Sequence, residues 1–298
     1  YTSVHTLSLH DALPISPAMS DALLRPPLPR WPWPPVLAAS VGVHALAAVA
    51  AAAAPAHAGG AAAVVALNHL VLTGAGLWPR STLLGPNLRR LPAAAASRRQ
   101  VALTFDDGPD PEVTPRVLDL LDAAGARATF FVIGERVLAA PALAREIVAR
   151  GHALANHSAA HRHDFSLRGP ARLEREIARA QHILADVAGV RAHCFRAPAG
   201  LRNALLDPVL HRLNLHLVSW TRRGYDTREG SAERVLARLV RELAAGDIVL
   251  LHDGNAARTP HGSPVVLDVL PRLLAALRAA RLETVTLADA IAPRHAPA

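Results

Sequence analysis

From Val101 to about Ala290, short apolar runs alternate with longer amphipathic segments. The runs have the length of strands, and the segments between them carry apolar residues at helical spacing, as Val117, Leu118 and Leu121 do. Because parallel strands need a crossover between them, this alternation predicts an α/β fold with a parallel sheet, open or closed into a barrel. We expect strands at residues 101–105, 128–133, 152–156, 193–196, 215–220, 247–251 and near 283–285, and helices at residues 113–124, 142–150, 170–187, 203–213, 231–245 and 264–280 before a terminal helix.

The charge distribution separates the first hundred residues from the rest. The chain has a net charge of +8, of which residues 1–100 contribute +5 from seven arginines and two acids. The remaining 25 arginines and 22 acids are nearly balanced, and only 4% of all residues are aromatic. Since a nucleic-acid interface needs a concentrated basic face with stacking rings, we expect no nucleic-acid partner. The single cysteine, Cys194, excludes an internal disulfide framework and a Cys-rich zinc site.

The first hundred residues divide by composition. Residues 1–18 lack periodicity, and residues 8–16 resemble a translated sequencing adapter, so we expect a non-native read-through, with an authentic upstream segment as the alternative. Two uncharged runs, residues 36–54 and 61–78, are each close to the roughly 20 residues that cross a bilayer. We therefore divide the chain into a read-through (1–18), a Pro-rich segment (19–35), two apolar helices (36–78), a basic linker (79–99), one α/β domain (100–292) and a tail (293–298).

The two uncharged runs have three interpretations. As a membrane-spanning hairpin they are flanked by Arg25 and Arg30 on one side and five arginines on the other, so the positive-inside bias puts both ends, and the α/β domain, on the cytoplasmic face of the inner membrane. Alternatively, residues 36–54 are the core of a signal peptide with a cleavage site at residues 56–58, and the domain is exported. In the third interpretation both runs are alanine-rich helices packed on the domain.

Two polar clusters in the α/β domain suggest a metal site. Asp106 and Asp107 directly follow the first strand, where two carboxylates repel each other unless a cation is bound; a solvated turn is the alternative. His157 and His161 follow the third strand, and residues four apart lie on the same face of one helical turn. This HxxxH spacing alone is a weak signal in a chain with 16 histidines. Together with a carboxylate it predicts Asp-His-His coordination with open positions for water, as in catalytic metal sites.

Three further clusters follow later strands. Arg196 follows the fourth strand in a Pro-containing turn and can orient a carboxylate. Residues 220–226 (WTRRGYD) follow the fifth strand, and His252 follows the sixth, where it is a candidate general acid. Because the carboxyl ends of parallel strands lie along one edge of a sheet, these clusters predict a single site.

In order and spacing, these motifs resemble the NodB-homology polysaccharide deacetylases, carbohydrate esterase family four. The resemblance rests on TFDDGP at residues 104–109 and HSAAH at residues 157–161, and it covers residues 99–290. It implies a distorted (β/α) barrel, here preceded by the apolar, membrane-spanning helical segment. It also implies a bacterial metal-dependent hydrolase that removes an N-acetyl or other small acyl group from an amino sugar in a poly-, oligo- or lipid-linked glycan.

The resemblance assigns four catalytic roles in this sequence. Asp106 would be the base that takes a proton from the attacking water, and Arg196 would orient it. His252 would be the general acid that protonates the leaving amine. Asp226, six residues after Trp220, would pair with His252 and raise its pKa, so that the acid stays charged.

The resemblance also implies a cofactor and a substrate site. The metal would be Zn²⁺ by default, with Co²⁺, Ni²⁺ or Mn²⁺ as alternatives. The backbone N–H of Ala199 would help to stabilise the oxyanion, and Leu250 would line the acyl pocket. The implied metal ligands are Asp107, His157 and His161, and the implied substrate contacts are Pro198, Ala199, Gly200, Trp220, Tyr225 and Leu250.

The sequence departs from the family pattern at several positions. Ala199 and Thr227 stand where the family usually carries aromatic residues, which removes stacking surface unless Trp220 and Tyr225 replace it. Arg222 and Arg223 stand where residues are usually acidic or neutral. With the membrane segment, these departures favour a shorter, anionic or lipid-linked glycan over a long, neutral chitin-like polymer.

An alternative function is a catalytically silent carbohydrate-binding protein, because a fold alone does not guarantee activity. The retained base, metal ligands, arginine and histidine argue against it. A silent relative would be free to lose them.

Overall fold

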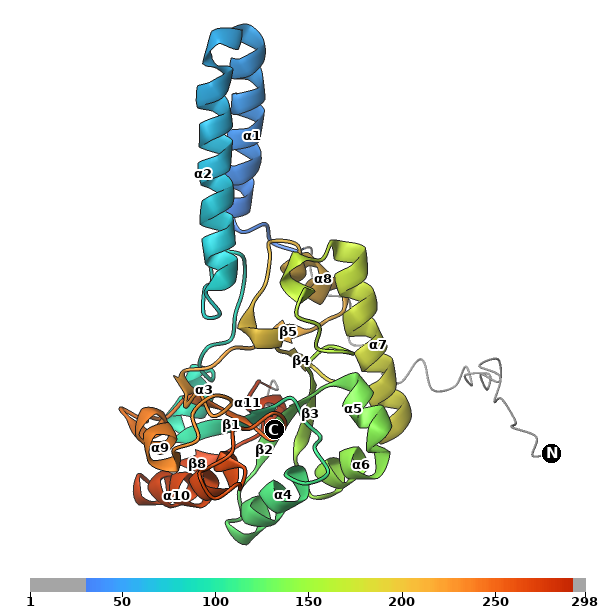
Figure 1. Ribbon diagram of the computed structural model, residues 1–298, viewed down its shortest axis with the longest axis vertical. Helices are drawn as coiled ribbons and strands as arrows, with labels where there is room; N and C mark the ends of the chain where they lie inside the picture. Colours follow the sequence, from blue (N-terminus) through green and yellow to red (C-terminus); the bar gives the residue numbers. More distant parts are fainter. Residues whose placement is uncertain (1–30, 292–298) are drawn as a thin grey trace, which may run out of the picture. The chain divides into compact units, whose positions relative to one another are not determined.

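A computed structural model describes residues 31–291 (Figure 1). The expected read-through at residues 1–18, most of the Pro-rich segment and the tail at residues 293–298 lie outside the described residues. The helices are α1 (Pro35–Ala53), η2 (Pro55–His57), α2 (Ala58–Leu77), α3 (Ala93–Ser97), α4 (Thr114–Ala123), α5 (Gly134–Ala139), α6 (Pro141–Ala149), η3 (Phe165–Leu167), α7 (Pro170–Ala188), η4 (Pro198–Gly200), α8 (Leu206–Arg212), α9 (Ala232–Val240), α10 (Val265–Ala279) and α11 (Leu287–Ile291). The strands are β1 (Gln100–Asp106), β2 (Ala128–Val132), β3 (Ala153–Asn156), β4 (Cys194–Phe195), β5 (His216–Leu217), β6 (Arg222–Arg223), β7 (Ile248–His252) and β8 (Glu283–Thr284).

The strands form one parallel sheet. Their order is β5-β4-β3-β2-β1-β7-β6, and β8 pairs with β1 outside this path. Among the described residues, the end strands β5 and β6 do not pair with each other, so the barrel is open there. At the centre of the sheet, Asp106 at the end of β1 lies opposite Phe131 of β2 on one side and His252 of β7 on the other. The predicted distorted (β/α) barrel is therefore confirmed, with β1 in its middle.

Both faces of the sheet are buried. In β1, Leu103 and Phe105 pack into a large cluster with α4, α6, α9 and α10, whereas Ala102 belongs to a smaller cluster on the other face. In β2, Phe130 and Phe131 divide in the same way. Successive side chains of a strand point to opposite faces, so a sheet covered on both faces needs strands that are apolar throughout. This explains why β1 and β2 are continuous apolar runs in the sequence.

The structure differs from the predicted elements mainly in the short ones. All seven predicted strands are present, but β6 was not predicted because two adjacent arginines resemble a loop. The helix α5 was also missed, since its six residues are too few for a periodic pattern. The helix expected at residues 231–245 ends at Val240, and Glu242 two residues later has a left-handed φ of 55° that a helix cannot continue.

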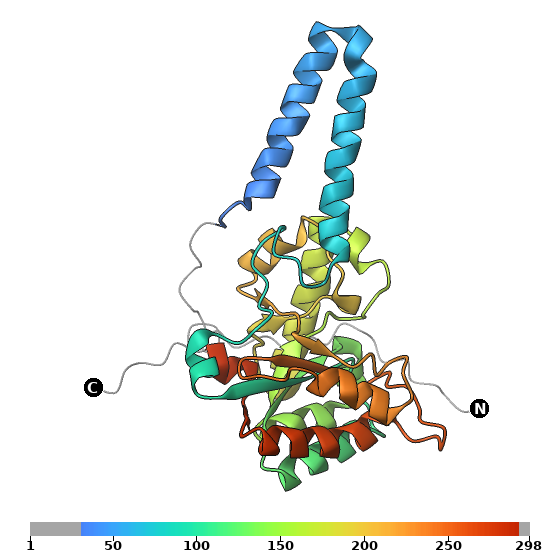
Figure 2. The same cartoon turned by 90° about the vertical axis from the view of Figure 1, so that its left-hand side faces the viewer.

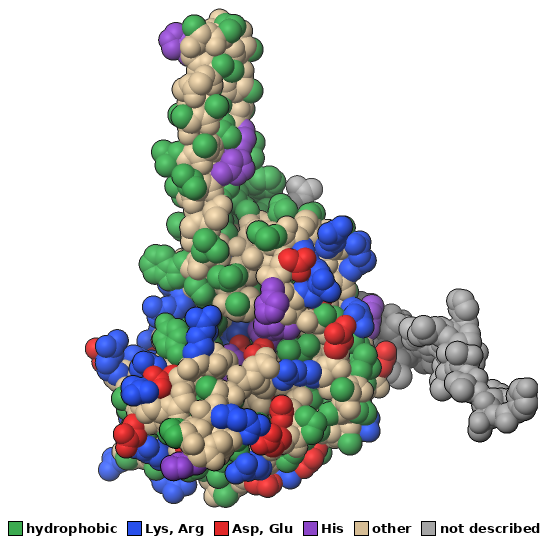
Figure 3. All heavy atoms as spheres, in the orientation of Figure 1, with side chains coloured by type: hydrophobic (Ala, Val, Ile, Leu, Met, Phe, Trp, Pro, Cys, Tyr) green, Lys and Arg blue, Asp and Glu red, His purple; other side chains and the backbone are tan. Residues whose placement is uncertain are grey.

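The helices α1 and α2 lie side by side as a hairpin joined by η2 (Figures 1 and 2). Asn68 Nδ2 donates to Ser40 Oγ at 2.8 Å, and the Nε2 atoms of His44 and His69 lie 3.2 Å apart, so polar groups join the two helices. Both are long and apolar enough to cross a membrane. On the face that Figure 3 shows, the hairpin carries histidines but no Asp, Glu, Lys or Arg side chains, and leucines such as Leu46 are exposed.

This exposure argues against the third interpretation of the apolar runs. Helices packed on the domain would bury one face, but in α1 only Ser40 is buried, and in α2 only Ala75 and Gly76 are. The hairpin fits a membrane anchor or a signal sequence, where lipid covers such apolar side chains.

Residues 79–99, which we expected to form a basic linker, are packed on the domain instead. Leu84, Leu91 and Ala95 are buried. Arg202 Nη2 donates to the carbonyl of Ser81 at 2.7 Å, and the backbone N–H of Leu88 donates to the carbonyl of Leu217 at 2.9 Å. The arginines of this segment predicted a solvent-exposed linker, but the few apolar residues between them pack against the domain.

Candidate active site

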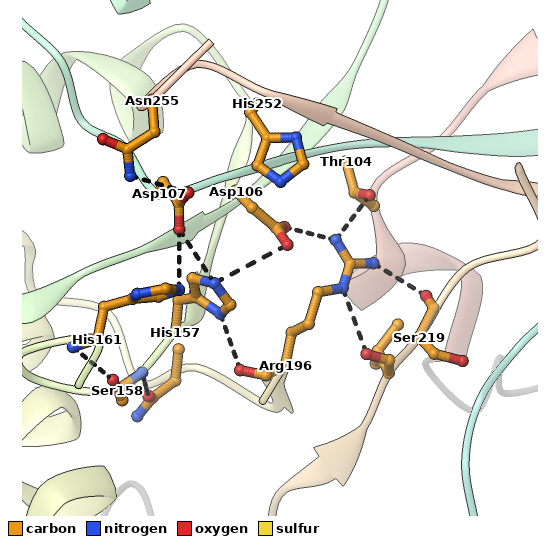
Figure 4. A network of polar contacts seen from close by, with 12 residues as sticks. Thr104, Asp106, Asp107, His157, Ser158, His161, Arg196, Ser219, His252 and Asn255 are labelled. Atoms are coloured by element: carbon orange, nitrogen blue, oxygen red, sulfur yellow. Dashed lines mark hydrogen bonds and ion pairs between the residues drawn. The ribbon is translucent and has the colours of Figure 1, made fainter. Parts of the chain in front are cut away.

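The structure brings together the side chains predicted to act as one site (Figure 4). They come from the carboxyl ends of neighbouring strands, because parallel pairing aligns those ends along one edge. Asp106 ends β1 and Asp107 follows it, His157 follows β3, Arg196 follows β4 and His252 ends β7.

Asp107, His157 and His161 present one ligand atom each to a common point. Asp107 Oδ1 lies 3.3 Å from Nε2 of each histidine. The three ligand atoms lie within 4.8 Å of one another. Asp107 Oδ1 is buried and has no hydrogen-bond partner among the described residues, which costs free energy unless something else is bound to it. Two imidazole nitrogens and one carboxylate oxygen fit Zn²⁺ or another first-row divalent metal.

The two histidines are brought together by a loop, so the predicted helical turn is wrong. Residues 157–161 contain no helix, and Ser158 and His161 have left-handed φ angles of 67° and 47°. Asn156 Oδ1 accepts the backbone N–H of Ser158 at 2.8 Å, and Ser158 Oγ accepts that of His161 at 3.0 Å. These side-chain hydrogen bonds compete with helical ones and hold a tighter turn.

Hydrogen bonds and nearby charges set the tautomer of His157 and the ionised state of Asp107 that metal ligands need. His157 Nδ1 lies 2.8 Å from the carbonyl oxygen of Arg196. Because a carbonyl only accepts, the proton of the neutral ring sits on Nδ1, and the Nε2 lone pair faces Asp107. Burial disfavours the charged form of Asp107. While no metal is bound, a protonated His157 ring, through its hydrogen bond and charge, and the charges of His252 and His161 outweigh burial and lower the pKa of Asp107. The carboxylate therefore stays ionised, as a metal ligand must.

Two residues that sequence reasoning missed hold Asp107 in place. Asn255 Nδ2 donates to Asp107 Oδ2 at 3.0 Å, and Arg136 Nη1 donates to the Asp107 carbonyl at 2.8 Å. Arg136 Nη2 also donates to Asn255 Oδ1 at 2.8 Å, which links the two. A Cβ on Gly254 would lie 2.4 Å from the Asp107 carbonyl oxygen, so the approach requires glycine there. The Gly-Asn pair after His252 and Asp253 was the available signal in the sequence.

We predict that Asn255→Ala weakens metal binding by about 10- to 100-fold, because the carboxylate of Asp107 loses the donor that orients it. The measurement is a calorimetric titration of the metal-free full chain with Zn²⁺. Asn68→Ala is the matched control, since the Asn68 amide donates to Ser40 Oγ between the two helices of the hairpin. Equal affinity of Asn255→Ala and the unchanged chain would contradict the role.

Arg196 and Asp106 form a buried ion pair. Arg196 Nη1 lies 2.5 Å from Asp106 Oδ1 and also donates to Thr104 Oγ1 at 2.9 Å. Arg196 Nη2 donates to the carbonyl of Ser219 at 2.9 Å, and the guanidinium carbon lies 4.0 Å from the centre of the Phe131 ring. With so many contacts the guanidinium is fixed, and it directs one oxygen of Asp106 toward itself. Asp106 Oδ2 faces the metal group, 3.9 Å from His157 Nε2.

His252 and Asp226 form a second buried pair. Asp226 Oδ2 accepts the backbone N–H of His252 at 2.7 Å, and Asp226 Oδ1 lies 2.9 Å from the ring Nδ1. Burial alone would lower the pKa of His252, but the charge and hydrogen bond of Asp226 raise it to about 9. The His252 ring points toward Asp106 in Figure 4. A charged imidazole therefore faces the site at neutral pH, as a general acid must.

We predict a pH profile that depends on Asp226. A general acid works in its protonated form, so kcat/KM should hold up to about pH 9, the pKa of His252, and fall above it. In Asp226→Asn the charge that opposes burial is gone, so the pKa of His252 falls and the alkaline decline begins at lower pH. Asp186→Asn, at an exposed position of α7, is the control. An alkaline decline at the same pH in Asp226→Asn would contradict the pairing.

The predicted substrate contacts differ in exposure. Pro198, Trp220 and Leu250 are buried, whereas Ala199 and Tyr225 are exposed, and Gly200 is half-buried. The guanidinium carbons of Arg196 and Arg223 lie 5.8 and 5.1 Å from the centre of the Trp220 ring. Trp220 is buried and lies close to two arginines, so little of its ring is exposed, and its replacement of the missing aromatic rings stays a prediction. Tyr225 is half exposed, so its ring has surface available for stacking on a sugar.

Arg222 and Arg223 were together predicted to favour an anionic substrate, but their side chains have different surroundings in the structure. Arg222 Nε donates to the fully buried Asp247 at 2.7 Å, and its Nη atoms donate to the carbonyls of Arg241 and Glu242. It fixes the end of α9 to the sheet and is not free for substrate. Arg223 has no such ion pair among the described residues, and its Nε is buried without a hydrogen-bond partner there.

Asp253, next to His252, is a further buried acid that had no predicted role. Thr114 Oγ1 donates to Asp253 Oδ2 at 2.6 Å. Burial raises the pKa of Asp253 to about 7, although the hydrogen bond from Thr114 opposes this. A Cβ on Gly108 would lie 2.1 Å from the Asp253 carboxylate, so the turn after Asp107 packs directly on it. Asp253 thus shapes the loop that carries Asp107.

Comparison with known proteins agrees with this site. The family model for polysaccharide deacetylases matches residues 93–218. A peptidoglycan-N-acetylglucosamine deacetylase of Bacillus cereus is 32% identical over 197 residues, which cover 65% of this chain and 89% of the relative. A chitooligosaccharide deacetylase of Bradyrhizobium is 36% identical over 174 residues, 56% of this chain and 76% of the relative. A family 4 carbohydrate esterase from Streptomyces lividans, solved with acetate, has a TM-score of 0.56 at 33% identity, covering 62% of this chain and 91% of its own.

The fold and these relatives define the class as a carbohydrate-active hydrolase on an open (β/α) barrel. The chain belongs to the polysaccharide deacetylase family. The predicted resemblance is thereby confirmed, and so is the prediction that the chain is an enzyme.

Proposed function

We propose that the chain is a metal-dependent deacetylase that removes an N-acetyl or other small acyl group from an amino sugar in a glycan. The observation that carries the proposal is the pair of buried ion pairs beside the Asp-His-His group. Asp106–Arg196 offers a carboxylate base, and Asp226–His252 offers a charged acid. Relatives whose names specify deacetylation of N-acetylglucosamine or chitooligosaccharide support the substrate class.

The metal would be held by Asp107, His157 and His161, and Zn²⁺ is the first choice for two imidazoles and one carboxylate, with Co²⁺, Ni²⁺ and Mn²⁺ as alternatives. When bound, such an ion acts as a Lewis acid that polarises water and a carbonyl oxygen. Three ligands from the protein leave positions open for both, which is typical of catalytic sites.

The protein's own side chains would move the protons. Asp106, held by Arg196, accepts a proton from the water that attacks the amide carbon. His252, kept charged by Asp226, donates a proton to the nitrogen as the carbon–nitrogen bond breaks. The exposed residue Ala199, with a left-handed φ of 56°, would direct its backbone N–H at the developing oxyanion.

The test is release of acetate from N-acetylglucosamine oligomers by the purified full chain, before and after treatment with a chelator. We expect activity to disappear with the metal and to return on addition of Zn²⁺. His161→Ala should lose both metal and activity, whereas His182→Ala, on α7 away from the site, should keep both. A chain that binds the oligomer without releasing acetate, metal present, would instead support the silent carbohydrate-binding protein.

We propose further that the hairpin of α1 and α2 spans the inner membrane and leaves the enzyme domain on the cytoplasmic face. The support is the exposed apolar surface of both helices and the arginines that flank them. Export through a signal peptide cleaved at residues 56–58 is the competing arrangement. A reporter fused to the carboxyl terminus distinguishes them, since a reporter active only outside the cytoplasm should stay silent.

A further inference from the structure

A cavity lies beside the active site. It has a volume of about 780 Å³ and opens between the end of α2, strand β6 and helix α9. Trp220 lines this cavity and also lies 5.8 Å from the guanidinium carbon of Arg196, so one ring separates the cavity from the Asp106 ion pair. The cavity is therefore near enough for a second part of a bound substrate.

The walls of the cavity are strongly basic. Arg80, Arg223, Arg238 and Arg241 line it in addition to Arg222, and the acid among the lining residues is Glu242. Arg222 is engaged with Asp247 and Arg238 with Glu229, but Arg80 and Arg241 form no ion pair within the described residues. Figure 3 shows basic side chains gathered below the lower end of the hairpin.

Aromatic rings hold one of these arginines in position. The guanidinium carbon of Arg223 lies 5.1 Å from the centre of the Trp220 ring and 4.9 Å from that of Tyr225. Its Nε is buried and lacks a hydrogen-bond partner among the described residues. Its Nη atoms also form no hydrogen bond or ion pair among the described residues, and such a guanidinium suits an anion that accepts several hydrogen bonds at once, as phosphate oxygens do in the geometry that arginine favours.

The end of the hairpin links this cavity to a membrane surface. Trp78, directly after α2, lines the cavity and is 63% exposed. Tryptophan favours the interface between lipid and water, so a hairpin that spans the membrane would place the cavity at the level of the head groups. Phosphate groups that are attached to lipids lie at this level.

We infer that the cavity binds a phosphate group of a membrane-anchored glycan, so that the acetylated sugar next to that phosphate reaches Asp106 and His252. The inference rests on the proposed deacetylase function. In this inference the anion is bound by Arg223, Arg80 and Arg241, and not by the predicted pair of Arg222 and Arg223. It also accounts for the missing aromatic residues of the sugar groove, because charge replaces stacking as the source of affinity.

The test compares two substrates in neutral detergent: an N-acetylglucosamine oligomer and N-acetylglucosamine linked through diphosphate to a polyprenol. We expect a higher kcat/KM for the phosphorylated substrate. The double variant Arg80→Gln/Arg241→Gln should lower the ratio of the two kcat/KM values by about tenfold or more, because charge-assisted hydrogen bonds are lost. Arg272→Gln, at an exposed position of α10, is the matched control and should leave the ratio unchanged.

Further measurements separate the possible outcomes. Inorganic pyrophosphate should bind the unchanged chain and bind the double variant about tenfold more weakly in a calorimetric titration. An equal ratio and equal pyrophosphate affinity in the double variant would overturn the inference. So would activity on a neutral glycolipid that depends on added phosphatidylglycerol and on Arg80 and Arg241, because the bound phosphate would then be a lipid head group. Failure of the unchanged chain to hydrolyse either substrate would instead overturn the proposed function, and pyrophosphate binding would still test the cavity.

Discussion

Asp106→Asn is expected to lower the rate of deacetylation by about 10²- to 10⁴-fold, the range that general base catalysis contributes. The substitution keeps the size of the side chain, and the amide oxygen can still accept from Arg196, which lies 2.5 Å from the carboxylate in the unchanged chain. It removes the group that takes the proton from water. The ligands Asp107, His157 and His161 stay in place, so the variant should bind metal as well as the unchanged chain does.

The measurement is kcat/KM for acetate release, with metal content determined on the same sample. Asp107→Asn is the matched comparison, because it changes the neighbouring carboxylate in the same way and should lose metal as well as activity. If Asp106→Asn also lost its metal, Asp106 would be a ligand and not the base. If it kept full activity, the assignment of the base would be wrong.

The position of the site along the sheet could be predicted because the strands are buried on both faces. The central strands of such a sheet are mainly apolar, so a polar side chain at the end of a run, such as Asp106 or His252, is conspicuous in the sequence. Parallel pairing then brings the ends together without further information. In the structure, the register of β1 and β7 places Asp106 opposite His252, as this reasoning expects.

The loops could not be predicted in the same way. The spacing of His157 and His161 predicted a helical turn, but Asn156 and Ser158 hold the backbone in a tighter loop through side-chain hydrogen bonds. Asn255 comes from a loop 148 residues after Asp107, and no local pattern in the sequence reveals such a contact. Contacts of this kind depend on how the loops pack, and that is decided only once the sheet has formed.

The roles of the two arginines in the fourth cluster, residues 220–226, could not be predicted from their charge either. Arg222 and Arg223 are adjacent and identical in type, and the sequence predicted one role for both. In β6 their side chains alternate, so Arg222 reaches Asp247 while Arg223 lies against Trp220 and Tyr225. The strand is too short to be recognised in the sequence. Its alternation of side chains makes one arginine structural and leaves the other available to a ligand.

Arg196→Met is expected to destabilise the protein by about 3–5 kcal/mol, because it leaves the carboxylate of Asp106 buried without its partner. Arg196 is 1% exposed and Asp106 is 4% exposed, so water cannot replace the guanidinium. Methionine occupies similar space and restores no charge. The measurement is the free energy of unfolding of the full chain in detergent, obtained from denaturant titrations. The exposed pair Arg258–Glu112 is the control, since Arg258→Met should change stability little.

The double variant Arg196→Met/Asp106→Asn distinguishes an unpaired charge from lost packing. Asparagine carries no charge, so removal of both charged partners should cost less than Arg196→Met alone, and the double-mutant cycle should show a favourable coupling between the two positions. If the effects of the two substitutions simply added, Arg196 would act through its contacts with Thr104, Phe131 and Ser219 and not through Asp106. A favourable coupling would mean that the charge of the base is maintained in the buried site by the arginine beside it. The same ion pair would then account for both the stability of the sheet centre and the ionised state that catalysis requires.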